Sequence, residues 1–141
     1  MSVEVKVEYE GDLHCRAVHG PSGAAIATDA PVDNQGKGEA FSPTDLVGTA
    51  LGTCVATIMG IAARREGWDI TGLRATVVKE MVATPTRRIG TLHVELVMPR
   101  ERAAKLDAKA RAVLEAAGRG CPVKASLHPD VRCELVFRWD G

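Results

Sequence analysis

The sequence has few aromatic residues and no net charge. It contains two Phe, two Trp and one Tyr, and its 18 Lys and Arg balance its 18 Asp and Glu. A surface that follows a nucleic-acid backbone gathers basic residues on one face, commonly with aromatic residues among them. No stretch of this chain has that composition. We therefore expect no nucleic-acid partner.

The sequence also shows neither the pattern of a secretion signal nor that of a membrane span. The chain begins MSVEVKVEYE, which is charged from its fourth residue and has neither a basic n-region nor an apolar h-region. The most apolar stretch, from Leu46 to Ala63, is interrupted by Thr and Gly and flanked by Asp45 and Arg64. We expect a cytoplasmic protein in which this stretch is a core helix, with no membrane contact.

The cysteines and histidines lack the spacing of a metal site. None of the four cysteines forms a C-x-x-C pair, and the four histidines are scattered, with no two placed on one helix face. A disulfide framework is also disfavoured in a chain that is not secreted. We expect no bound metal, and each cysteine has to be judged from its own surroundings.

What the sequence does have is the composition of one folded domain. Its 141 residues are 45% hydrophobic and 26% charged, which is ordinary for a globular protein of about 100–150 residues. We therefore expect residues 1–141 to form a single domain.

The N-terminal third predicts a three-stranded antiparallel meander. Apolar and charged residues alternate from Val3 to Tyr9, the pattern of a half-buried strand. Glycine-containing turns then separate two further strands, Leu13–Val18 and Ala24–Thr28. The stretch Asp29–Ala40 is rich in Gly, Asp and Asn and predicts a loop.

A long helix follows this loop. Ser42 can cap it, Pro43 suits its first position, and Asp45 stands where the acid of a capping box would. The helix runs to about Glu66 and ends at Gly67. Because nearly all its faces are apolar or small, it must be buried on most sides.

The remaining sequence predicts a hairpin, two helices and a last strand. The helix from Arg100 is amphipathic and ends at Gly118, and a short helix opens at Cys121-Pro122. The order βββ-α-ββ-α-α-β predicts an α+β domain. The strands are Leu73–Val82, Thr91–Met98 and Val131–Trp139, and the amphipathic helix is Arg100–Ala117.

A cysteine is a nucleophile only as its thiolate. Cys121 is a good thiolate site by position, because unpaired backbone N–H groups at a helix start favour an anion. Cys54 lies mid-helix among apolar residues, and by itself it is more typical of an inert core thiol. Cys133 and Cys15 lie in strands and are expected to be structural. A Cys121–His128 hydrolase is conceivable, but its short spacing fits no known signature.

Two motifs raise Cys54 above that default. The segment SPTDLVGTALGTC, from Ser42 to Cys54, resembles the signature of the OsmC/Ohr family, in which a Pro-led buried helix carries a reactive cysteine three turns in. The later Cys121-Pro122-Val123 resembles the second motif of that family. The order of strands and helices also agrees from Val3 to Trp139.

The resemblance implies a thiol-dependent peroxidase that reduces organic hydroperoxides, with Cys54 attacking the peroxide and Cys121 closing a disulfide onto it. It implies no metal, flavin or haem. It also implies an intertwined homodimer with long buried central helices, and an external dithiol, in the Ohr branch a lipoylated protein, that reopens the disulfide. Apolar helix residues such as Leu51, Val55 and Ile58 would then favour organic peroxides over hydrogen peroxide.

The sequence departs from the family at the groups that hold the thiolate. Better-understood branches carry a Glu directly after the motif proline, paired with an Arg, and here that position is Thr44. Asp45 either supplies a carboxylate or caps its helix. No motif places the Arg; Arg16 and Arg88 are the nearest candidates. The alternative function is therefore a non-catalytic, stress-related protein that keeps the fold and binds a small molecule.

Overall fold

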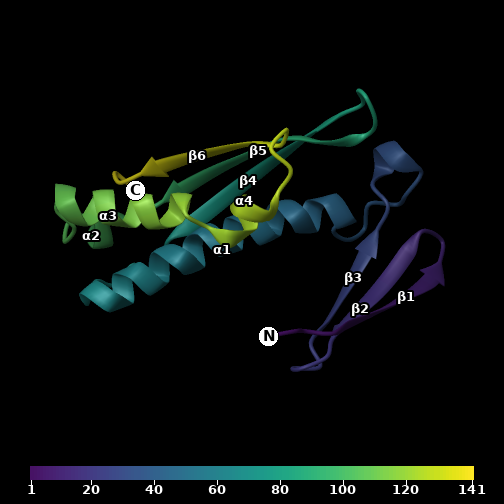
Figure 1. Cartoon of the computed structure of the whole chain (residues 1–141), viewed down its shortest axis with the longest axis horizontal. Coiled ribbons are helices and arrows are strands. Elements are labelled where there is room, and N and C mark those ends of the chain that lie inside the picture. Colours follow the sequence, from purple (N-terminus) through teal and green to yellow (C-terminus); the bar gives the residue numbers. More distant parts are fainter. The chain divides into compact units, whose positions relative to one another are not determined.

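The computed structural model describes residues 1–141, which divide into two units, Met1–Val47 and Gly48–Gly141. Each unit holds a three-stranded sheet, and most of the helical segments belong to the second unit (Figure 1). The order of strands and helices confirms the predicted α+β class.

The N-terminal unit is the predicted antiparallel meander. Its strands are β1 (Val5–Gly11), β2 (His14–His19) and β3 (Ala25–Asp29), in the order β1-β2-β3. Asp12 and Leu13, both at positive φ, make the first turn. Cross-strand partners share a face, so Val7 opposite Ala17, and Ala17 opposite Ile26, place apolar residues together.

The segment predicted as a loop contains one short 3-10 helix, η1 (Val32–Asn34). It returns to the sheet through an isolated bridge between Thr28 and Phe41. Helix α1 (Pro43–Glu66) then begins as predicted. The Oγ of Ser42 accepts a hydrogen bond from the Asp45 N–H at 3.1 Å, and Asp45 Oδ2 accepts one from the Ser42 N–H at 2.9 Å. This reciprocal pair is a capping box.

The C-terminal unit is a second sheet, in the order β4-β5-β6. β4 pairs antiparallel with β5, and β6 pairs parallel with β5. The inner face of β5 carries Leu92, Val94 and Leu96, which are fully buried. The strands are β4 (Arg74–Val82), β5 (Arg88–Val97) and β6 (Arg132–Arg138).

Small residues let α1 approach its neighbours closely. A Cβ on Gly52 would stand 2.6 Å from Cγ2 of Val77 on β4, so only glycine fits there. Gly118, on α3 (Ala108–Arg119), lies against Met59 and Val55 of α1. The prediction that Gly118 ends its helix is therefore wrong: the helix continues to Arg119, and the glycine serves the contact between α3 and α1.

The helix predicted over Arg100–Ala117 is divided. α2 (Arg100–Ala103) ends after four residues, and α3 starts anew because Asp107 caps it, its Oδ1 accepting from the Ala110 N–H at 2.8 Å. The amphipathic pattern spans both pieces and hides the break. The short helix α4 (Pro122–Ser126) follows as predicted.

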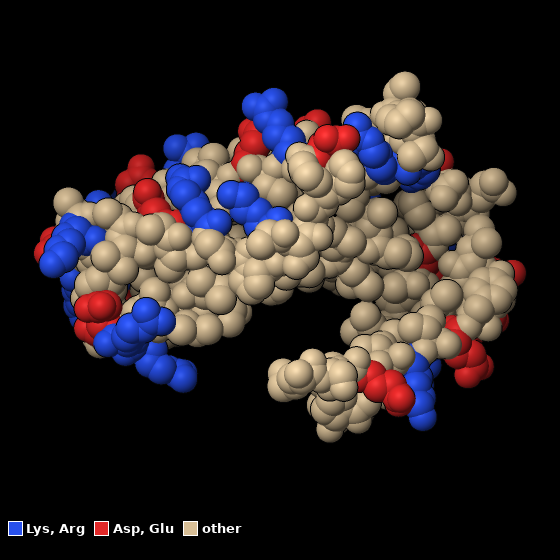
Figure 2. All heavy atoms as spheres, viewed as in Figure 1, with Lys and Arg blue, Asp and Glu red and all other residues tan.

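One side of α1 remains uncovered in the single chain. Thr53, Thr57 and Ile61 are exposed, and Ile61 keeps 51% of its surface accessible. By length and composition α1 could cross a membrane, but core helices pass the same test, and 39% of its apolar window is buried inside the chain. Figure 2 shows acidic and basic side chains interspersed on the visible surface of both units.

Candidate active site

Two of the four thiols meet in the C-terminal unit. Cys54 lies on α1 and is half-buried, and Cys121 is the N-cap of α4 and is 1% exposed. Cys54 is near enough to Cys121 for its side chain to raise the pKa of the Cys121 thiol. The two thiols are therefore neighbours within one unit.

Burial is the largest cause of the raised pKa of Cys121. The Cys54 side chain adds to it, while the backbone N–H groups of Lys124 and Val123 oppose it. The Lys124 N–H lies 3.4 Å from the Cys121 sulfur. These helix-end donors are the groups expected to make Cys121 a thiolate, and burial outweighs them. The expectation that Cys121 is a good thiolate by position is therefore wrong.

Thr44 and Asp45 both take part in starting α1. The Oγ1 of Thr44 lies 3.2 Å from the Ser42 Oγ, and Asp45 completes the capping box. Of the two roles open to Asp45 from sequence, the structure thus shows capping. Thr44 supplies no carboxylate, so a negative charge next to the motif proline has to come from elsewhere.

The two arginine candidates, and Lys37 of the segment before α1, lie on different elements. Arg16 is exposed on β2 and stands opposite Glu8 of β1. Arg88 begins β5, and its Nη1 donates to the Ile89 carbonyl at 3.4 Å. Lys37 lies in the segment after η1, where its charge lowers the pKa of Asp29. None of the three is a group that shifts the pKa of Cys121.

The other thiols sit in the sheets, as expected. Cys133 lies opposite Leu92 on the inner face of the second sheet, and burial raises its pKa. Cys15 stands between Tyr9 and Thr28 in the first sheet. His128 is exposed, and its Nδ1 accepts a hydrogen bond from the Asp130 N–H. No histidine is among the groups that shift the pKa of Cys121, which disfavours a Cys121–His128 pair.

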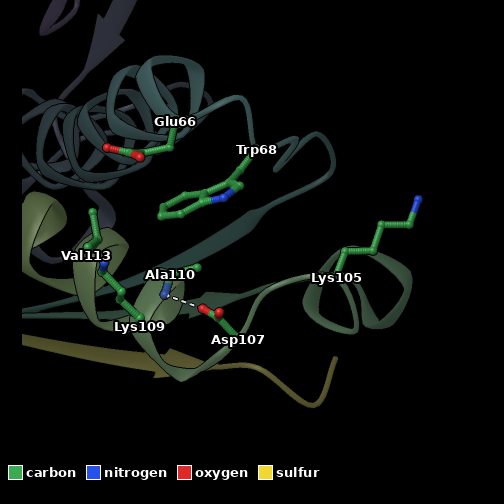
Figure 3. A pocket seen from close by; sticks show the side chains of 7 residues that line it. All are labelled: Glu66, Trp68, Lys105, Asp107, Lys109, Ala110 and Val113. Carbon is green, nitrogen blue, oxygen red and sulfur yellow. Dashed lines mark hydrogen bonds between the residues drawn. The ribbon is translucent and has the colours of Figure 1, made fainter.

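A separate hollow of about 290 Å³ lies between the end of α1 and the start of α3. Figure 3 shows the Trp68 ring inside it, between Glu66 and Val113, with Lys105 pointing away. No cysteine lines this hollow, so it is not the site of thiol chemistry. No three His, Cys, Asp or Glu side chains are grouped so that they could hold a metal ion.

Sequence reasoning missed one polar cluster. His14 of β2 reaches Asp29 of β3 through Nδ1, and Glu10 of β1 through Nε2. The pairing of His14 with Asp29 follows from the strand register, which the alternation of residues does not fix without the turns. The one available signal was the position of both residues at the same end of adjacent predicted strands.

Comparison with known proteins gives one family and one fold. The pattern of the OsmC-like protein family matches residues 36–136. A solved structure from Psychrobacter arcticus, of a candidate osmotic stress induced and detoxification response protein, is 46% identical, with a TM-score of 0.87 and coverage of 95% of this chain and 94% of that one. Curated proteins give no match.

More distant structures share the fold. An organic hydroperoxide resistance protein OsmC from Legionella pneumophila is 14% identical, with a TM-score of 0.74 and coverage of 98% of this chain and 97% of that one. One from Elizabethkingia anophelis is 11% identical, with a TM-score of 0.70 and coverage of 98% and 96%. At such identities the likeness is one of fold alone.

Proposed function

The chain belongs to the OsmC-like protein family, and from that premise we propose that it is a thiol-dependent peroxidase that reduces organic hydroperoxides. The observation that carries the proposal is the closeness of the Cys121 and Cys54 thiols, which is sufficient for the Cys54 side chain to raise the pKa of Cys121. It supports a redox pair in which Cys121, whose raised pKa favours the neutral thiol, reacts second. Solved relatives named as organic hydroperoxide resistance proteins add support from the fold.

The proposed reaction begins at the half-buried sulfur of Cys54. Its thiolate attacks the terminal oxygen of the peroxide, the O–O bond breaks, and the alkoxide leaves and takes a proton from solvent to become an alcohol. Cys54 is then a sulfenic acid. The Cys121 sulfur attacks the Cys54 sulfur, a disulfide forms, and water leaves with the Cys121 proton.

An external dithiol closes the cycle. It gives up two hydrogen atoms to the Cys54–Cys121 disulfide and becomes a disulfide itself. We propose a lipoylated protein as this reductant, because the resemblance to the Ohr branch implies one. Cytoplasmic location is part of the same proposal, since the cytosol maintains dithiol reductants.

A homodimer is also proposed. In the single chain Val7 and Tyr9 of β1 keep 67% and 62% of their surface exposed, and Ile61 of α1 keeps 51%. Exposed apolar side chains in each unit are candidates for interaction sites, and a second copy would cover them. Light scattering at micromolar concentration should give twice the 15.0 kDa chain mass. A monomer mass would contradict the proposal.

Mapping of the oxidised thiols tests the assignment of the pair. After one equivalent of cumene hydroperoxide, peptide mapping should find a Cys54–Cys121 disulfide and two thiols lost per chain. Cys15→Ser and Cys133→Ser are matched controls and should form the same bridge. A main bridge that contains Cys15 or Cys133 would refute the assignment.

Rates of Cys54 oxidation test the substrate class and the altered thiolate support. Cumene hydroperoxide should react faster than hydrogen peroxide, because a bulky substrate gains about 25 cal/mol per Å² of apolar surface buried. Of the predicted apolar lining, Leu51 and Val55 are fully buried and only Ile58 is partly accessible in the single chain. The preference therefore depends on Ile58 and on surface that a second copy would add.

Thr44→Glu restores the carboxylate of the family pattern. It should speed oxidation if a cation such as Arg16 pairs with it, and slow it if none does, because a lone carboxylate raises the thiol pKa. Asp45→Ala and Ser42→Ala both break the capping box, and only the first removes a charge. A slower rate in Asp45→Ala alone would give Asp45 an electrostatic role. Equal rates for both peroxides in every variant would make Cys54 an ordinary core thiol.

The alternative is a non-catalytic protein that binds a small molecule. It is favoured by one observation: Thr44 lacks a carboxylate and Asp45 is engaged in capping. Ligand binding that leaves both thiols reduced under peroxide would support this alternative. Cys-dependent hydrolysis would instead show as activity on an activated ester that Cys121→Ala abolishes.

A further inference from the structure

His14 lies between carboxylates of both neighbouring strands. Its Nδ1 is 2.5 Å from Asp29 Oδ1 on β3, and its Nε2 is 3.5 Å from Glu10 Oε1 on β1. A neutral imidazole carries one N–H, so only the imidazolium can donate from both nitrogens. The arrangement therefore suits the charged ring.

Asp29 connects this ring to the segment that follows β3. Its second carboxylate oxygen accepts a hydrogen bond from the Glu39 N–H at 3.0 Å, and its own N–H donates to the Phe41 carbonyl at 3.1 Å. Asp29 is only 6% exposed. Water therefore cannot easily replace these partners, and one buried residue fastens the far end of the segment to the sheet.

The near end of the segment is tied to the same place. The Ala30 N–H donates to the Leu13 carbonyl at 3.0 Å, next to His14 in sequence. Residues 30–41 thus leave the sheet and return to it within one cluster. Phe41 directly precedes Ser42, so this closure also sets where the capping box of α1 begins.

We propose that Glu10, His14 and Asp29 form a pH-sensitive latch on residues 30–41, closed while His14 is an imidazolium and loosened when the ring loses its proton. The neutral ring can keep one hydrogen bond to Asp29, but that bond is no longer charge-assisted, and charge-assisted bonds are roughly twice as strong. The ion pair with Glu10 is lost.

The charges around the ring set the direction of the switch. The hydrogen bond from His14 to Asp29 raises the pKa of His14, the charges of Asp29, Glu10 and Glu39 add to it, and burial opposes it. The same hydrogen bond, the Glu39 N–H and the charges of His14 and Lys37 lower the pKa of Asp29 against burial. The raised pKa of His14 and the lowered pKa of Asp29 both favour the charged pair, and the latch loosens as the pH rises through the raised pKa of His14.

Amide hydrogen exchange of the full chain tests the latch without any peroxidase measurement. The protection of the Glu39 amide, corrected for the intrinsic exchange rate, should fall by about fivefold between about pH 6 and pH 9 as the charge-assisted bond is lost. In the His14→Gln variant the Glu39 amide should have low protection, and this protection should not change with pH. His19→Gln is the matched control, because His19 lies on the same strand and its ring is hydrogen-bonded to Ser22, away from Asp29.

Three outcomes would overturn the latch. They are constant Glu39 protection in the wild type, pH dependence that persists in His14→Gln, and a fall in His19→Gln that is absent in the wild type. A direct NMR titration of His14 keeps the test independent of the variants. A ring midpoint above about 6.5, matched by the Glu39 amide shift, supports the latch, and a midpoint at or below that value overturns it.

Discussion

The two units of the chain differ in what holds them together. The large, fully buried apolar side chains all lie between Leu51 and Leu114, in the C-terminal unit. The N-terminal sheet instead leaves Val5, Val7 and Tyr9 exposed, and its one buried charged residue is Asp29. A sheet of three strands needs a covered apolar face to be stable. Within the single chain the N-terminal unit therefore relies on its backbone hydrogen bonds and on polar contacts such as the one between His14 and Asp29.

Matched truncations in the two units should show the largest difference in the free energy of unfolding. Leu92→Ala removes a fully buried side chain from the second sheet and should lower the free energy of unfolding by about 2–5 kcal/mol. Val7→Ala removes a side chain that is 67% exposed, and its effect in a monomer should stay within about 0.5 kcal/mol. Urea denaturation at fixed protein concentration measures both.

The Val7 result also separates monomer from dimer. If a second copy covers β1, Val7→Ala should lower the free energy of unfolding more at high protein concentration than at low concentration, because association stabilises the folded chain. Leu92→Ala should cost the same at both concentrations. A large, concentration-independent loss in Val7→Ala would mean that β1 is covered within the chain.

The sequence predicted most of the elements because their signals are local. Alternation predicted the meander, and the Ser42, Pro43 and Asp45 pattern placed the start of α1. The break between α2 and α3 was missed because Leu106 and Ala110 continue the apolar pattern across it, while Asp107 reads equally well as a surface charge. A helix cap inside a periodic run is hard to distinguish from an exposed acid.

The residues of the candidate site were predicted, but their ionisation was not. The two motifs identified Cys54 and Cys121, and the structure brings those thiols together. Their ionisation could not be inferred from position, because burial depends on packing between distant elements such as α1 and α4. The His14–Asp29 pair was missed because it depends on register across two turns.

The smallest predicted effect, the pH dependence of stability, distinguishes the two units most sharply. His14 has a raised pKa in the folded chain, so its contribution is fully present below the unfolded value of 6.5 and is lost as the pH rises through the folded pKa. Cys121 and Cys133 also have raised pKa values, but the ordinary thiol pKa is 9.0, so their contributions are lost only in a more alkaline range.

The free energy of unfolding should therefore fall in two steps as the pH rises. His14→Gln should remove the lower step, while Cys121→Ser should reduce the upper step and leave the lower one unchanged. Urea denaturation at intervals from about pH 6 to about pH 10 resolves the two ranges. If one smooth decline appears and neither substitution alters its shape, the N-terminal ion pair and the buried thiols do not titrate as separate groups, and the contrast between the units fails.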